Sequence, residues 1–307
     1  MKACIDIGGT KVAVSLSSGK GMELLARRSE STAKTGSNDA LAMQVIRMVD
    51  EACAQTGVAA GSVQQAGVSS CGPFVMRGGM LELAAPNICG GIAGPAAGLP
   101  NAWRTALLEA PLRARFAQVR VENDGVAALE AERRWGALQG LDHCAYVTWS
   151  TGVGMGLCVD GRILRGKNGN AGHGGHTFVS DNNDALCGCG NLGDVEGLVG
   201  GSSIGRRFGA DAATLLQRAQ EGHAASRAQV DELCRVMGRA LYNLIAILDL
   251  QRISLGGTVF CKHQAYLLPR LRSEVEGKLP ALTSGCELVG AGLAERVGDY
   301  AALALLI

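Results

Sequence analysis

The chain has 307 residues, 47% of them hydrophobic, and its 29 Lys and Arg residues nearly balance its 28 Asp and Glu residues. This length suits one large or two ordinary domains, and the balanced charge argues against a nucleic-acid partner, which would need a basic surface. No segment approaches the ~18 consecutive apolar residues of a membrane span, and Asp6 interrupts the N-terminal run where a signal peptide would be apolar, so we expect a soluble, cytoplasmic protein.

The first half of the chain predicts an α/β lobe. Short β-rich runs separated by turn residues predict three antiparallel strands within residues 3–29. A helix is expected after residues 37–39, which provide capping side chains. The further expected elements are a strand at 64–69, a hairpin at 73–84, a loop at 86–100, a helix at 103–116, a strand at 119–122 and a helix at 124–135.

The second half of the chain repeats this order. Strands at 144–149 and 154–159 flank a glycine-rich turn, and 165–201 is expected to be a long loop. Apolar residues at three- and four-residue spacing predict the longest helix over 226–248. The last expected elements are a strand at 252–255, a helix at 264–277, a strand at 286–289 and a helix at 292–306. Two similar lobes suggest a nucleotide held in a cleft between them.

Glycine and cysteine are the two residue types with unusual frequencies. The 44 glycines are about twice the ~7% average usage, which is typical of tight turns and close backbone approaches. The 11 cysteines are an odd number in a long chain, whereas secreted disulfide frameworks are usually short and even-numbered. Most are therefore expected to be buried thiols of a reduced compartment.

Three glycine-rich turns stand beside strands, at residues 8–11, 150–156 and 256–258. Glycine lets backbone N–H groups approach phosphate oxygens, and the threonine and lysine of the first turn add donors. Asp6, just before that turn, could hold a magnesium ion, usually through water. One such turn could equally be an ordinary β-turn, but three together predict a nucleotide site.

Asn123 and Asp124 follow a strand and open a helix. Aspartate is a favoured helix N-cap, which is one explanation for its presence. A carboxylate at the C-terminal end of a strand is also where α/β proteins place their chemistry. The residues alone leave both readings open.

A glycine-rich loop carries His176, Cys187, Cys189 and Asp194. One imidazole and two thiolates are soft ligands suited to tetrahedral zinc, and the aspartate could supply a fourth, oxygen ligand. The alternative is a pair of free surface thiols beside a solvated histidine. Exposed cysteines without a metal are open to oxidation, which favours the zinc reading.

The chain resembles the bacterial repressor, open-reading-frame and kinase (ROK) family of sugar kinases. The matching stretches are DIGGTK (6–11), PN (86–87), END (122–124), STGVGMG (150–156), AGHGGH (171–176), CGCGNLGDVE (187–196) and LGG (255–257). The resemblance implies an α/β, two-lobed, actin-like ATPase fold, related to ribonuclease H, with the active site in the interlobe cleft. The expected lobes are 1–121, with the helix 292–307 packing back on it, and 122–291, which carries the His/Cys loop.

The resemblance also implies a role for each motif residue. Asp124 would be the general base that takes the proton from the sugar hydroxyl attacking the γ-phosphate of ATP, with Mg²⁺ as a cofactor. ATP would be bound by Asp6, Gly8, Gly9, Thr10, Lys11, Thr151, Gly152, Gly154, Gly256 and Gly257. The sugar would be bound by Asn87, Asn123, His173, His176 and Glu196. A structural Zn²⁺ would be held by His176, Cys187, Cys189 and Asp194, the last replacing a family cysteine, which leaves zinc occupancy open.

The resemblance narrows the substrate to a sugar. His173 stands where most members carry glutamate, and residues 171–177 are similar to bacterial N-acetylmannosamine kinases. A glucokinase or another hexose or hexosamine kinase is the alternative. A sugar-responsive transcriptional repressor shares the fold, but it would need a DNA-binding region ahead of the motif at residue 6. Family members are commonly dimers, so we expect a homodimer with a small-molecule substrate and no nucleic-acid or membrane partner.

Overall fold

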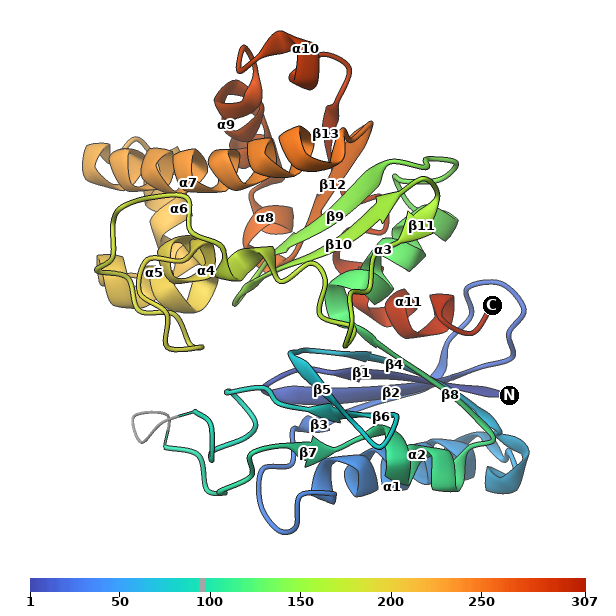
Figure 1. The fold of residues 1–307 in the computed structure, drawn as a ribbon. Coiled ribbons are helices and arrows are strands. Elements are labelled where there is room, and N and C mark those ends of the chain that lie inside the picture. The colour runs from blue at the N-terminus through green and yellow to red at the C-terminus, as the bar shows by residue number, and fades with distance from the viewer. Residues whose placement is uncertain (94–97) are drawn as a thin grey trace. The chain divides into compact units, whose positions relative to one another are not determined.

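The computed structural model describes residues 1–93 and 98–307, so residues 94–97 of the expected 86–100 loop lie outside it. The chain forms two compact units (Figure 1). The first unit comprises Met1–Ala131, Arg165–Asn170 and Gly298–Ile307, and the second comprises Glu132–Leu164 and Ala171–Val297.

These boundaries lie later in the chain than the expected lobe boundaries after residues 121 and 291. The first difference arises in helix α3 (Asp124–Trp135), which continues directly from a strand of the first unit. Ala127 of this helix packs on Ala301 and Leu305 near the C-terminus. The first turns of α3 therefore stay with the first unit.

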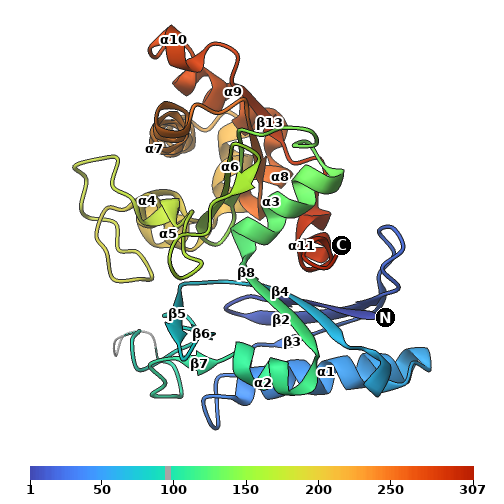
Figure 2. The same cartoon turned by 45° about the vertical axis from the view of Figure 1, so that its right-hand side comes forward.

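A five-stranded sheet organises the first unit. Its strand order is β3-β2-β1-β4-β8, with β1, β4 and β8 parallel and β2 and β3 antiparallel. Helices α1 and α2 cover one face, and α11 covers the other (Figures 1 and 2). The elements are β1 (Lys2–Ile7), β2 (Lys11–Ser17), β3 (Leu25–Ser31), α1 (Ala40–Thr56), β4 (Gln65–Ser70), α2 (Glu109–Arg115), β8 (Gln118–Asn123) and α11 (Val297–Ala304).

The second unit repeats the same sheet topology. Its order is β11-β10-β9-β12-β13, with β9, β12 and β13 parallel and β10 and β11 antiparallel, as the repeated sequence order predicted. Its strands are β9 (Cys144–Trp149), β10 (Val153–Val159), β11 (Arg162–Ile163), β12 (Arg252–Gly256) and β13 (Glu287–Gly290). Its helices are α4 (Val195–Val199), α5 (Gly201–Phe208), α6 (Ala212–Gln220), α7 (Ala224–Leu248), α8 (Thr258–Lys262), α9 (Gln264–Val275) and α10 (Pro280–Thr283).

Apolar periodicity identifies the buried face of the long helix in the second unit. The predicted long helix is α7, and its buried face carries Val230, Leu233, Met237 and Leu241. The first unit also contains a small three-stranded sheet of β5 (Phe74–Arg77), β6 (Met80–Leu83) and β7 (Ala106–Leu107). Short 3-10 helices in the described residues are η1 (Ala60–Ser62), η3 (Gly174–His176) and η4 (Ala294–Arg296). Among the described residues, no helix is both long and apolar enough to cross a bilayer.

Three of the expected elements need correction. The helix expected at 103–116 begins only at Glu109, because Ala106 and Leu107 pair with β6 as strand β7. The long loop expected at 165–201 contains η3 and α4. The final helix, expected from residue 292, is η4 followed by α11. Four further short helices of the second unit, α5, α6, α8 and α10, are absent from the sequence-based prediction.

A buried carboxylate ties together several elements of the second unit. Glu132 is fully buried in α3, and its carboxylate accepts the backbone N–H groups of Ala137, Gly292 and Leu293 at 2.8–2.9 Å. It also accepts the hydroxyl of Ser254, in β12, at 3.0 Å. One side chain thus joins the end of α3, a central strand and the segment that follows β13.

Replacing Glu132 with glutamine tests this interaction. Glu132→Gln keeps the size but turns an acceptor into an NH₂ donor that faces backbone N–H groups. A buried polar group left unpaired costs roughly 1–3 kcal/mol, so we expect the free energy of unfolding in urea to fall by about 3 kcal/mol. The control is Glu221→Gln at the exposed C-cap of α6, which should change it by less than ~0.5 kcal/mol. Equal stability of the two variants would contradict the assignment.

Candidate functional site

The parallel strands of the first unit bring distant residues to one sheet edge. Asp6 of β1 pairs with Ser69 of β4, which pairs with Glu122 of β8. The C-terminal ends of these three strands are therefore level, and the N–H of Cys71 continues the pairing to the carbonyl of Ile7 at 2.9 Å. This register places Asp6, near the end of β1, and Asp124, just after the end of β8, at the same edge of the sheet.

Two carboxylates, those of Asp6 and Asp124, lie at this edge of the sheet. Ser69 Oγ donates to Asp6 Oδ1 at 3.2 Å, while burial raises the pKa of Asp6 to about 6, an effect that the charge of Lys11 opposes. Burial also raises the pKa of the Cys71 thiol, and the charges of Asp124 and Asp6 add to the effect. The thiol thus lies within the electrostatic reach of both carboxylates. Sequence reasoning missed Ser69 and Cys71, because they look like ordinary residues of a buried strand.

The first glycine-rich turn is held from two sides. Gly8 N–H donates to the Lys11 carbonyl at 2.8 Å, closing the turn. Thr32, after β3, binds the same turn: its hydroxyl donates to the Gly8 carbonyl at 2.7 Å, and its N–H donates to the carbonyl of Thr10 at 3.1 Å. A Cβ at Gly9 would lie 2.2 Å from the amide nitrogen of Asn87. The predicted sugar-binding asparagine therefore lies against the predicted phosphate turn.

The side chains of Asn123 and Asp124 meet where α3 begins. The N–H of Gly125 donates to Asn123 Oδ1 at 3.0 Å and to Asp124 Oδ1 at 2.8 Å. Asp124 is the first residue of the helix rather than the residue before it. Both side chains contact the start of α3 and also stand at the end of β8, so the structural and chemical readings are compatible.

The second glycine-rich turn packs against the start of α5. The N–H groups of Gly201 and Ser202 donate to the carbonyls of Ser150 and Thr151 at 2.8 and 3.0 Å. A trans peptide directs its N–H opposite to its C=O, so the N–H groups of Thr151 and Gly152 point away from α5. These two N–H groups are therefore directed to the side of the turn opposite α5.

The third glycine-rich turn follows β12, which is parallel to β9, with Gly256 opposite Thr148. Gly257 has φ +87°, and a Cβ there would lie 2.4 Å from the carbonyl oxygen of Trp149, so only glycine suits this position. The hydroxyls of Ser150 and Thr258 are 2.9 Å apart and hydrogen-bonded. The second and third turns are thus linked through the threonine that ends the predicted third turn.

The histidine loop lies along the first half of strand β10. Met155 N–H donates to the Gly172 carbonyl at 3.0 Å, and a Cβ at Gly175 would lie 2.2 Å from the carbonyl oxygen of Val153. The rings of His173 and His176 have their centroids 6.1 Å apart. The glycines of this segment let both histidines approach the strand that leaves the second turn.

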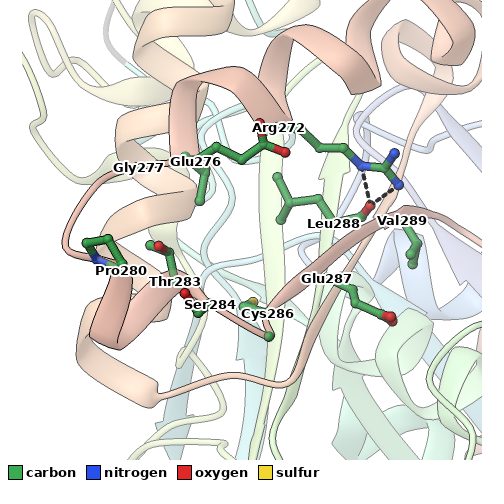
Figure 3. Close-up of a pocket in the computed structure, with 12 residues that line it drawn as sticks. Arg272, Glu276, Gly277, Pro280, Thr283, Ser284, Cys286, Glu287, Leu288 and Val289 are labelled. Atoms are coloured by element: carbon green, nitrogen blue, oxygen red, sulfur yellow. Dashed lines mark hydrogen bonds between the residues drawn. The ribbon is translucent and has the colours of Figure 1, made fainter.

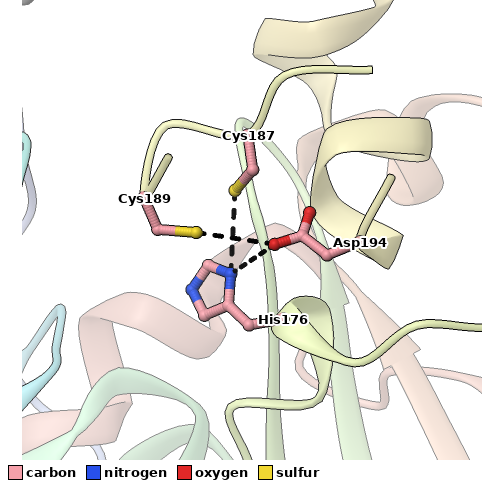
Figure 4. Close-up of side chains that lie close together, drawn as sticks. All are labelled: His176, Cys187, Cys189 and Asp194. Atoms are coloured by element: carbon pink, nitrogen blue, oxygen red, sulfur yellow. Dashed lines mark hydrogen bonds and ion pairs between the residues drawn. The ribbon is translucent and has the colours of Figure 1, made fainter. Parts of the chain in front are cut away.

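Four potential ligands from the same unit converge in Figure 4: His176, Cys187, Cys189 and Asp194. Their ligand atoms all lie within 4.8 Å of one another. His176 Nδ1 is 3.1 Å from Asp194 Oδ2 and 3.7 Å from Cys187 Sγ, and Cys189 Sγ is 3.5 Å from the same carboxylate oxygen. One nitrogen, two sulfurs and one oxygen so arranged fit a tetrahedral zinc ion.

Asp194 uses its two carboxylate oxygens differently. Oδ1 caps α4 by accepting the N–H of Gly197 at 2.7 Å, while Oδ2 faces the ligand cluster. Burial works against its charge, but hydrogen bonds from His176, Gly197 and Asn191 lower the pKa of Asp194. The bond to Asp194 in turn raises the pKa of His176. A carboxylate here can therefore serve both as ligand and as helix cap.

Glu196 lies two residues beyond Asp194 and contacts two parts of the unit. Its Oε2 accepts the N–H of Val153 at 2.9 Å, and its Oε1 lies 3.4 Å from Cys187 Sγ. The residue predicted to bind sugar thus contacts both the second turn and the ligand cluster.

The large cavity in Figure 3 lies elsewhere in the second unit. It has a volume of about 510 Å³, between α9, α10 and β13, and none of the predicted site residues is among the residues that line it. Arg272 donates two N–H groups to the carbonyl of Leu288 at 3.1 and 2.8 Å, which occupies part of the edge of β13. Burial raises the pKa of Cys286 to about 11. This cavity offers no chemistry matching the predicted site.

The raised pKa of Asp6 gives a pH-dependent stability. Because the folded carboxyl binds its proton more tightly than the unfolded one, stability falls as pH rises from about 4 through 6. Asp6→Asn removes this penalty, so its stability relative to wild type should grow between pH 4 and 7 by on the order of 2–3 kcal/mol. Urea denaturation measures this, with Asp160→Asn at an exposed turn as the control. A difference independent of pH would refute the buried-charge account.

Comparison with known proteins agrees with this geometry. The family model of the ROK family matches residues 2–305. The N-acetylmannosamine kinase of Salmonella newport is 33% identical over 266 residues, covering 83% of this chain and 82% of that protein. The ROK hexokinase of Thermus thermophilus has a TM-score of 0.76 at 28% identity, covering 98% of this chain and 96% of its own. A ROK glucokinase of Streptomyces griseus, solved with glucose and AMPPNP, has a TM-score of 0.71 at 23% identity, covering 99% and 97%. The fold is the two-lobed, actin-like ATPase fold of these sugar kinases, and the chain belongs to the ROK family.

Proposed function

We propose that the protein is an ATP-dependent kinase that phosphorylates the 6-hydroxyl of a 2-acetamido-hexose, with N-acetylmannosamine as the best candidate. The observation that carries the kinase assignment is the edge of the first sheet, where Asp6, the Gly8–Lys11 turn and Asp124 lie level. Phosphoryl transfer to a hydroxyl uses groups that position the phosphates and a carboxylate that accepts the proton of the hydroxyl, and this edge carries candidates for both.

In this proposal the first unit supplies the proton acceptor. Asp124 takes the proton from the sugar hydroxyl as that oxygen attacks the γ-phosphorus, while Asn87 and Asn123 orient the sugar. The turn at Gly8–Lys11 donates backbone and side-chain hydrogen bonds to phosphate oxygens. Asp6 would help to hold Mg²⁺, which would neutralise charge on the phosphates. Burial that raises the pKa of Asp6 to about 6 still leaves it largely ionised at neutral pH.

The second unit supplies the remaining nucleotide and sugar contacts. The N–H groups of Thr151 and Gly152 face away from α5 and are placed to donate to phosphate oxygens. Gly154, near the start of β10, leaves room for the phosphates to approach the strand. Gly256 and Gly257 contact the nucleoside part of ATP. His173, His176 and Glu196 contact the sugar, and zinc, when bound by the cluster, fixes the loop that carries them.

The choice of sugar depends on His173. A neutral imidazole can donate from one nitrogen and accept at the other, whereas an ionised glutamate only accepts. The carbonyl of a 2-acetamido group needs a donor, and leaving it buried and unpaired would cost roughly 1–3 kcal/mol. The 33% identity to N-acetylmannosamine kinases supports the same sugar. Glucose is the alternative, because ROK hexokinases share the fold.

Steady-state kinetics on a panel of hexoses and acetamido-hexoses tests the function. We expect kcat/KM for N-acetylmannosamine to exceed that for glucose by about tenfold or more. Asp124→Asn should lower kcat by ~10²–10⁴-fold with little change in sugar affinity, whereas Asp142→Asn, at an exposed position, should leave both unchanged. Near-wild-type turnover in Asp124→Asn would refute the base. A preference for glucose would refute the acetamido substrate alone.

Elemental analysis tests the zinc site. Protein purified without added metal should contain about one zinc per chain. Cys187→Ala and Cys189→Ala should lose it, whereas Cys261→Ala, in α8, should keep it. Because metal binding needs a neutral imidazole and the pKa of His176 is raised, zinc should dissociate on acidification. A fully active, metal-free preparation would show that the cluster works without an ion.

A further inference from the structure

The contacts of Glu196 extend its role beyond sugar binding. Glu196 Oε2 accepts the N–H of Val153, the first residue of β10, at 2.9 Å. A Cβ at Gly152 would lie only 2.3 Å from the same oxygen. The carboxylate therefore lies directly against the proposed phosphate turn, and glycine at 152 is what allows this approach.

The rest of the segment containing Glu196 holds the same turn. Glu196 belongs to α4, whose C-cap is Gly200. The next two residues, 201 and 202, donate to the carbonyls of Ser150 and Thr151 in the turn. Ser202 Oγ adds a bond to the Thr151 carbonyl at 3.1 Å. Three residues of the turn, 150, 151 and 153, are thus fixed from a single segment, residues 196–202.

The opposite end of α4 is fixed by the ligand cluster. Asp194 caps the helix through Oδ1, and Glu196 Oε1 lies 3.4 Å from Cys187 Sγ. The chain of contacts runs from the cluster, through Asp194 and α4, to Glu196 and Val153. Each of these contacts lies within the second unit.

We propose that Glu196 is a positioning residue for the nucleotide: it connects the His/Cys/Asp cluster to the phosphate turn and sets the affinity for ATP and ADP even without sugar. This proposal rests on the proposed kinase function. A residue that only bound sugar would have no effect on nucleotide binding in the absence of sugar. The two roles therefore separate in a binding measurement.

The experiment is ADP binding, with Mg²⁺ and without sugar, measured by isothermal titration calorimetry. Glu196→Gln keeps the reach and an acceptor oxygen for Val153 N–H, so we expect ADP affinity within about threefold of wild type. Glu196→Asp keeps the charge but loses the reach, and Glu196→Ala loses both. Because neither variant can place an acceptor within reach of the Val153 N–H, that N–H loses its hydrogen bond, and these two variants should weaken ADP binding about tenfold or more. Gly205→Ala, in α5, where a Cβ meets open space, is the control and should bind ADP like wild type.

The outcomes separate this role from the proposed function. Wild-type affinity for ADP in both Glu196→Ala and Glu196→Asp would overturn the positioning role and leave the kinase assignment intact. An equal loss in Glu196→Gln and Glu196→Ala would also overturn it, since the acceptor would then not be the cause. Failure of the wild-type protein to bind ADP would overturn the kinase assignment and this role together. Thermal unfolding of each variant in the absence of ligand confirms that the compared proteins are folded.

Discussion

The in-register pairing of parallel strands is the constraint on which the placement of the predicted site residues depends in each unit. Parallel strands put their C-terminal ends on one edge, and the pairs Asp6–Ser69 and Ser69–Glu122 leave no offset between β1, β4 and β8. The pairing of Gly256 with Thr148 does the same for β12 and β9. Residues more than a hundred positions apart become neighbours because the sheet register fixes them, before any side chain contributes.

Close backbone approach is the second shared feature, and it explains the glycine content. A Cβ at Gly9, Gly152, Gly175 or Gly257 would lie 2.2–2.4 Å from a neighbouring heavy atom. Each of these positions borders a turn or loop assigned to ligand binding. The N–H groups of Thr151 and Gly152 point away from α5 because the carbonyls of Ser150 and Thr151 accept from Gly201 and Ser202. The turns are shaped by such backbone bonds together with a few polar side chains, among them Thr32 and Glu196.

The sequence predicted what depends on local pattern. The repeated order of strands and helices anticipated the two related sheets, and the spacing of His176, Cys187, Cys189 and Asp194 anticipated their convergence. It could not predict strand β7, because Ala106 and Leu107 pair with β6 only through tertiary context. The sequence could not predict the contact of Glu196 with Val153 either, since the two residues are 43 positions apart and no local pattern marks the pair. Ser69, Cys71 and Glu132 carry no motif, and their surroundings appear only in three dimensions.

The divided use of the Asp194 carboxylate has a consequence for oxidative damage. Peroxides convert cysteine ligands to sulfenic and higher acids, which abolishes metal binding, but they leave aspartate unchanged. The residue that caps α4 carries a carboxylate whose Oδ1 accepts the Gly197 N–H independently of the thiols. Oxidation of Cys187 or Cys189 would thus remove ligands without removing the helix cap. The segment that holds the second glycine-rich turn therefore keeps its anchor under oxidising stress, because the cap is a carboxylate and not a thiol.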